Sequence, residues 1–82
     1  MSAPRIMGVM LGDMLGPTEG TLQRLMPASI HGLTFWDVTV AFDDGGVETV
    51  RLGPEGVPKG LEAGDRVRAT RVGTVIIAIA KA

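Results

Sequence analysis

The stretch LTFWDVTVAFD at residues 33–43 decides the fold. Its even-numbered positions from 36 onward are all apolar, whereas its odd-numbered positions include Asp37 and Thr39. The even-numbered set is Trp36, Val38, Val40 and Phe42. A period of two, built from β-branched and aromatic residues, is typical of a half-buried strand. We therefore predict a strand here, with the even-numbered face turned toward the core.

The sequence DDGG at residues 43–46 follows, and it predicts a hairpin because glycine accepts the positive φ that tight turns require. A two-residue loop would pair Val40 with Thr49 and place polar groups on the core face. A three-residue loop at 44–46 pairs Val40 with Val50 instead. We predict the longer loop, with a left-handed glycine forming a bulge.

Further strands are predicted on both sides of this hairpin. Residues 47–52 form its partner, and residues 53–60 form a connection whose prolines exclude a ladder strand but allow one helical turn. Residues 66–72 alternate again. Residues 75–80 are apolar at both odd and even positions, which predicts a strand buried on both faces.

The region before residue 33 is ambiguous. Residues 20–26 suit either a helical stripe or a short strand, and we favour a strand with a bulge, followed by a loop from Pro27. Residues 1–16 place apolar side chains at helical spacing, although their glycines disfavour a helix. This apolar segment is expected to pack on the barrel or on a partner, as a short helix or as a strand.

The chain is predicted to be one all-β domain over residues 1–82. Its 82 residues allow a single core, and its twelve glycines and five prolines favour many short strands. The expected architecture is a small five-stranded barrel of the OB type, with an SH3-like barrel as the rival. The chain lacks a continuous apolar run long enough for a membrane span, so we expect a cytoplasmic protein without membrane insertion.

Residues 57–60 and 64–77, VPKG and GDRVRATRVGTVII, resemble the end of the soluble OB-fold domain of NfeD-like proteins. In that domain a glycine turn, an alternating valine strand and a second apolar strand close the barrel. The resemblance covers about a third of the chain. It implies the fold and carries over no site residue.

The sequence offers little for catalysis or for metal binding. There is no cysteine, and His31 is the only histidine. Ser29 lies near His31 in the expected loop, where the two residues lack the third group of a catalytic triad. Asp43 and Asp44 fit a turn better than a weak cation site. No phosphate-binding glycine motif is present, so we expect no enzyme activity and no cofactor.

Charge is distributed unevenly along the chain. Residues 37–48 carry four acids and no base, whereas residues 66–81 carry four bases and no acid. Arg66, Arg68 and Arg71 are therefore candidates for binding phosphates or an acidic partner. The alternative is that they pair with acids across the sheet.

These observations favour a non-catalytic interaction or assembly module. Self-association is expected through an apolar surface that includes Met7, Met10, Met14 and Ile76. The second hypothesis is weak binding of RNA or single-stranded DNA through the three arginines. The predicted inward direction of Trp36 and Phe42 counts against it, because single-strand binders stack bases on exposed aromatics. A third hypothesis is an accessory subunit of an enzyme.

Overall fold

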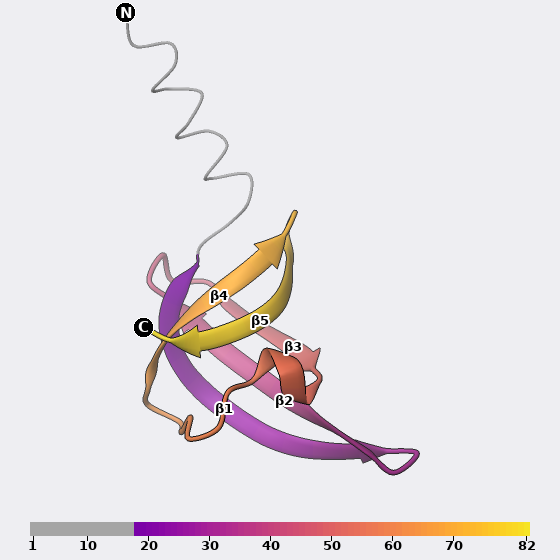
Figure 1. The fold of residues 1–82 in the computed structure, drawn as a ribbon. Coiled ribbons are helices and arrows are strands. Elements are labelled where there is room, and N and C mark those ends of the chain that lie inside the picture. Colours follow the sequence, from indigo (N-terminus) through magenta and orange to yellow (C-terminus); the bar gives the residue numbers. More distant parts are fainter. Residues whose placement is uncertain (1–17) are drawn as a thin grey trace, which may run out of the picture.

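The computed structural model describes residues 18–82, and these residues form an all-β fold (Figure 1). The strands are β1 (Glu19–Ile30), β2 (Leu33–Phe42), β3 (Val47–Leu52), β4 (Arg66–Val72) and β5 (Val75–Lys81). All neighbours pair antiparallel, in one sheet of order β3-β2-β1-β4-β5. Strand β4 returns beside β1, as in a Greek key. The predicted all-β, five-stranded architecture is confirmed, although no ladder joins β3 to β5 to close the barrel.

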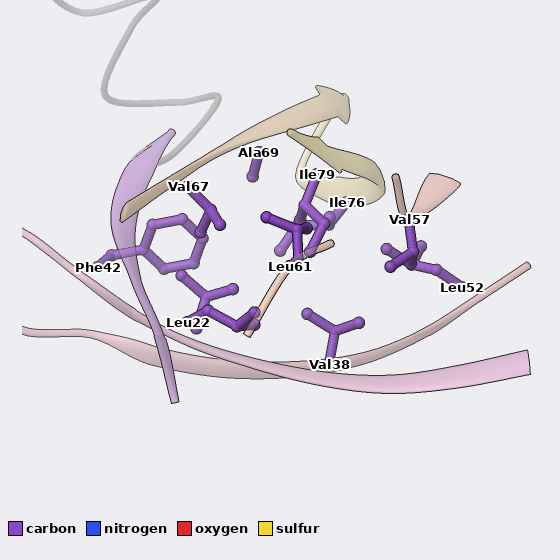
Figure 2. Packing of buried hydrophobic residues seen from close by; sticks show 11 residues of the cluster. Leu22, Val38, Phe42, Leu52, Val57, Leu61, Val67, Ala69, Ile76 and Ile79 are labelled. Atoms are coloured by element: carbon purple, nitrogen blue, oxygen red, sulfur yellow. The ribbon is translucent and has the colours of Figure 1, made fainter. Parts of the chain in front are cut away.

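The core lies on the inner face of this curled sheet, where side chains from every strand meet (Figure 2). The predicted core face of β2 is confirmed, since Val38, Val40 and Phe42 are buried. Trp36 stands on the same face at the margin of the core and is half-buried. The buried set is Leu22, Val38, Val40, Phe42, Leu52, Val57, Leu61, Val67, Ala69, Ile76 and Ile79.

The β2–β3 hairpin has the predicted three-residue loop, but the loop spans residues 43–45 and not 44–46. The amide of Phe42 donates to the carbonyl of Gly46 at 2.7 Å, and Gly45 has the left-handed φ of 97°. Val40 consequently pairs with Glu48 and not with Val50. The shift in register is two residues, so the predicted inner face of β3 is preserved. Sequence alternation alone does not distinguish two registers that bury the same face.

Strand β1 confirms the predicted strand and bulge but extends beyond the predicted loop at Pro27. The register shifts between Leu22 and Arg24, and the strand continues to Ile30. A two-residue turn, His31-Gly32, then joins it to β2; both residues have positive φ, 51° and 79°. This is the combination that a tight primed turn requires. Pro27 is tolerated because this half of β1 pairs only with β2.

Strand β5 contradicts the prediction of burial on both faces. Val75 and Ile77 are 61% and 47% exposed. The register against β4 shifts at Ile77, which has no partner in the ladder. This bulge allows Ile76 and Ile79, three positions apart, to point into the core together. The apolar residues at both odd and even positions therefore reflect this bulge, because the core-facing side chains are even-numbered before it and odd-numbered after it.

The predicted helical turn in the connection is the 3₁₀-helix η1 (Pro54–Gly56). It packs against β5 and β2. A Cβ on Gly56 would lie 2.9 Å from the carbonyl oxygen of Ile77, so only glycine allows η1 to approach β5 this closely. The connection then reaches β1, where the amide of Gly64 donates to the carbonyl of Leu22 at 2.7 Å.

Among the described glycines, Gly20 leaves the least room for a side chain. It pairs with Phe42 on one side and with Val67 on the other. A Cβ here would lie 2.8 Å from the Cα of Phe42 and closer still to the carbonyl oxygen of Ala41. The backbone of β1 can therefore lie this close to β2 only with glycine at position 20.

We expect Gly20→Ala to lower the free energy of unfolding by about 1–3 kcal/mol, the range for overpacking a core. Urea denaturation followed by the fluorescence of Trp36 measures it. Gly46→Ala is the matched control, since its φ is not positive and its Cβ would meet only the flexible Asp44 side chain. Equal stabilities of the two variants would contradict this account of Gly20.

Candidate functional site

The three candidate arginines lie on β4 but not on one face. Arg66 and Arg68 extend from its outer face, and their side chains are 49% and 64% exposed. Arg71 alternates with them and lies on the inner face of β4 with Val67 and Ala69, where its side chain is only 4% exposed. The structure therefore brings Arg66 and Arg68 together and separates Arg71 from them.

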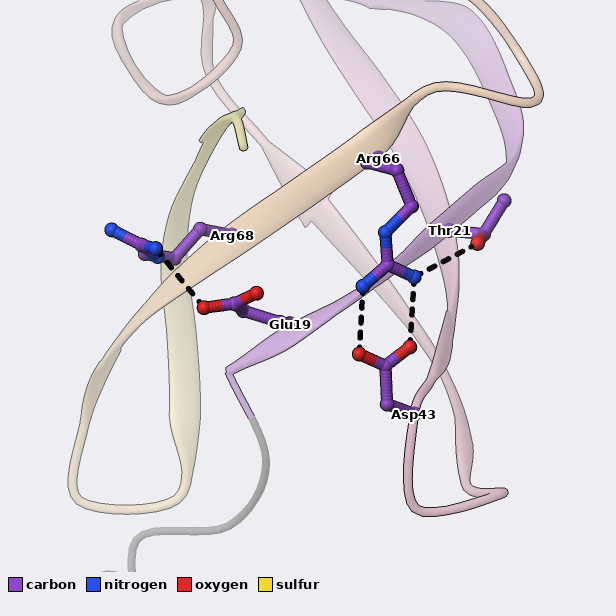
Figure 3. A network of polar contacts seen from close by, with 5 residues as sticks. All are labelled: Glu19, Thr21, Asp43, Arg66 and Arg68. Atoms are coloured by element: carbon purple, nitrogen blue, oxygen red, sulfur yellow. Dashed lines mark hydrogen bonds and ion pairs between the residues drawn. The ribbon is translucent and has the colours of Figure 1, made fainter.

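Arg66 and Arg68 are both engaged by carboxylates (Figure 3). Arg66 donates to both carboxylate oxygens of Asp43, at 2.8 and 2.7 Å, and also to the hydroxyl of Thr21 at 3.3 Å. Arg68 donates to Glu19 at 3.0 Å. These pairs join β4 to the β2–β3 loop and to β1. A phosphate group would have to displace a carboxylate from Arg66 to form the same bidentate contact.

Arg71 forms the most protected ion pair. Its guanidinium donates to Glu48 at 2.6 and 3.3 Å and to the carbonyl oxygen of Thr74 at 2.8 Å. It also lies over the ring of Phe42, 5.0 Å from the centroid, which allows a cation–π contact. This arrangement explains why the β2–β3 register places Glu48 on the inner face. The pair closes one end of the core between β3 and β4.

Of the four candidate interface residues, only Ile76 lies in the part of the chain that the structure describes. Met7, Met10 and Met14 lie outside the described residues. Ile76 is 4% exposed and belongs to the core, so its side chain cannot meet a partner. Its neighbour Ile77 is the exposed residue, because the bulge turns it outward.

A groove of about 340 Å³ opens at the margin of the core, on the inner face of the β1–β2 hairpin. Its walls come from β1, β2 and the connection that contains η1. The lining residues are Leu25, Thr34, Trp36, Pro54, Val57, Pro58, Lys59, Gly60 and Leu61. Lys59 is the one charged side chain among them. The groove is therefore an apolar surface with a single cation at its rim.

Sequence reasoning missed this groove. Alternation placed Trp36 on the core face, which is correct, but gave no measure of how far the core extends along the hairpin. The connection contributes Val57 and Leu61 to the core but leaves the indole of Trp36 half-buried. The available signal was the pair of apolar residues, Val57 and Leu61, within a connection otherwise rich in proline and glycine.

The acidic residues and the histidine of the described part of the chain do not gather into a metal-binding cluster. Within residues 18–82 no three or more histidine, cysteine, aspartate or glutamate side chains are placed to hold a metal ion. Asp44 accepts a hydrogen bond from the amide of Gly46 at 2.9 Å, as expected for a turn residue. Ser29 lies in β1 and His31 in the turn that follows it.

Comparison of the chain with protein-family models, with curated proteins and with solved structures gives no significant match. Across residues 18–82, no helix combines the length and the apolar character needed to cross a membrane. The function must therefore be argued from the geometry of the surface.

Two exposed ion pairs predict how stability depends on pH. Hydrogen bonds from Arg66 lower the pKa of Asp43, and hydrogen bonds from Arg51, at 2.7 and 2.9 Å, lower that of Asp37. A carboxyl group whose pKa is lower in the folded state stabilises the fold above its unfolded pKa, about 3.9. This stabilisation is lost as the pH falls through the lower, folded value.

We expect Asp43→Asn to reduce the loss of stability between about pH 4 and pH 2. Urea denaturation at pH 7, 4 and 2.5 measures this. Glu62→Gln removes an exposed acid that makes no ion pair with the described residues, and it serves as the control. A pH dependence of Asp43→Asn identical to that of the unmodified chain would show that the Arg66–Asp43 pair contributes nothing.

The Arg71–Glu48 pair predicts a larger effect. Glu48→Gln removes the carboxylate that the guanidinium of Arg71 contacts, and we expect a loss of about 1–3 kcal/mol in the free energy of unfolding. Glu55→Gln, at an exposed position of η1, is the control. The double variant Glu48→Leu/Arg71→Met should recover much of the loss, because it removes both charges. A double variant less stable than Glu48→Gln would argue against an electrostatic cause.

Proposed function

We propose that this chain is a non-catalytic interaction module of the OB type, and that it binds an extended segment of a partner protein in the groove beside Trp36. The observation that carries the proposal is the groove itself, an open cleft of about 340 Å³ with a mainly apolar lining. Clefts of this size that combine an apolar lining with a few polar groups are the usual sites of binding. An OB fold is a partly open, five-stranded Greek-key barrel, and the strand order here agrees with it.

The chemistry of the groove specifies its occupant. Leu25, Trp36 and Leu61 offer contacts to an apolar side chain, and the cation of Lys59 favours an acidic residue next to it. We therefore propose a peptide with an aromatic or aliphatic anchor flanked by aspartate or glutamate. The resemblance of residues 57–77 to NfeD-like domains supports an OB-type module and specifies no ligand.

The arrangement of the arginines favours this function over nucleic-acid binding. Arg66, Arg68 and Arg71 each have a carboxylate partner, and these partners offset the positive charge that phosphates would require. Trp36 lies in the groove and Phe42 in the core, so neither ring is displayed on the outer face of β4 beside Arg66 and Arg68.

Selection of a displayed peptide library on the full chain tests the groove. We expect enriched peptides to share an apolar anchor with a neighbouring acid, and to change the fluorescence of Trp36, the only tryptophan. Thr34→Arg fills part of the groove with a long side chain where the apolar anchor would lie, and should weaken binding at least roughly tenfold, whereas Lys59→Glu should weaken it about two- to fivefold in a salt-dependent manner.

Leu33→Arg is the matched control, because it introduces the same side chain one residue earlier, on the opposite face of the strand. It should leave peptide binding unchanged. Failure to enrich any peptide, or equal binding to the unmodified chain and to Thr34→Arg, would overturn the proposal.

A further inference from the structure

We infer that the opposite face of the same hairpin binds a second copy of this chain. The inference rests on the proposed role as an interaction module, but it concerns a different surface. We call residues 25–36 the arm, and we call the side chains of Met26, Ala28, Ile30, Leu33 and Phe35 the outer strip. The outer strip faces away from the groove, because side chains alternate along each strand.

The arm extends beyond the rest of the sheet. β3 pairs with β2 only from Trp36 onward, and β4 pairs with β1 only over Glu19–Thr21. The end of the arm is therefore a two-stranded ribbon, visible in Figure 1 as the long β1–β2 hairpin that leaves the barrel. An isolated two-stranded ribbon is only marginally stable in water, so packing on one of its faces would stabilise it.

The outer strip is continuous and apolar. Ile30 lies directly opposite Leu33, and Ala28 lies opposite Phe35, so these four side chains form two adjacent cross-strand pairs. Met26 extends the strip by one position toward the barrel. Met26, Ile30 and Leu33 are 46%, 36% and 63% exposed. At least a third of the surface of each of these three residues is therefore open to a partner.

Pro27 determines the mode of association. Ile30 and Leu33 close a two-residue turn and so form a hydrogen-bonded pair, which means that Ala28 and Met26 also bond to β2. Pro27 then faces the free edge of β1, where it offers no N–H group. A proline in the middle of an edge opposes the addition of another strand. Association through the face of the ribbon remains available.

The charge pattern identifies the occupant as a second copy. The arm contains no aspartate, glutamate, lysine or arginine, and it is the longest such run among residues 18–82. Charged residues lie only at its barrel end, where Met26 is opposite Asp37 and near Arg24, and Asp37 is already paired with Arg51. Selection of a different partner protein normally uses charged groups around the contact. A two-fold contact requires only a surface that fits itself without repulsion, and a neutral apolar strip meets this condition.

The contact should be weak. Five side chains per copy form a smaller surface than the roughly 800 Å² per partner of a standard interface, so we expect a dimer with a Kd on the order of 100 µM. Sedimentation velocity of the full chain from about 10 µM to 1 mM should show a concentration-dependent increase in mass toward the dimer.

Leu33→Arg should raise the Kd for dimerisation at least roughly tenfold, because it brings a cation into the contact from each copy. Thr34→Arg is the control on the groove face and should leave dimerisation unchanged. Pro27→Ala restores an N–H group to the free edge, and stronger association of this variant would show edge pairing and overturn the proposed mode.

A photo-crosslinking experiment identifies the occupant directly. Benzoylphenylalanine in place of Phe35 in a mixture of ¹⁴N- and ¹⁵N-labelled chains should give mixed-isotope crosslinks to residues 26–35. Crosslinks only within one chain, or a monomer at 1 mM, would overturn the inference. Dimerisation without any groove-binding peptide would instead remove the proposed function and leave this contact standing.

Discussion

The fold depends on how closely β1 approaches β2 at Gly20, where β4 also pairs with β1. Both β2 and β4 pair with β1 at Gly20 and Thr21, and the missing side chain of Gly20 allows the backbone of β2 to lie within contact distance. The ladder between β1 and β4 ends at Thr21, and the bulge between Leu22 and Arg24 then changes the direction of the rest of β1. The barrel, the groove and the arm therefore all begin from the same strand.

Ion pairs join the parts of the sheet that the ladder leaves apart. Arg66 and Asp43 connect β4 to the β2–β3 loop, and Arg71 and Glu48 connect the end of β4 to β3. The second pair is the more protected one, since Arg71 is almost completely buried at its side chain. The charge asymmetry in the sequence is thus offset in part within the fold, because two of the four acids of residues 37–48, Asp43 and Glu48, meet bases of residues 66–81.

Much of this fold could be predicted from local pattern. Alternation identified the core face of β2, and the glycines after Asp43 identified the hairpin and its left-handed residue. Pattern could not fix the β2–β3 register, because both three-residue loops bury the same face. It also could not reveal the bulge in β5, which places Ile76 in the core and Ile77 outside.

Less of the candidate site could be predicted. The arginines were recognised, and alternation in β4 already places Arg71 on the face of the buried Val67 and Ala69, opposite to Arg66 and Arg68. Whether each arginine is paired, however, depends on residues up to 49 positions away. The groove depends on how far the connection covers Trp36. Neither property has a local signature in the chain.

The pairing of β1 with β4 has a consequence for synthesis. As the chain leaves the ribosome, β1, β2 and β3 can pair in succession through short turns, but Glu19 must wait for Arg68 before the sheet can curl over its core. Until then the nascent chain would display an apolar ribbon without its cover. The late arrival of the last two strands makes this domain dependent on near-complete translation before it gains its final stability.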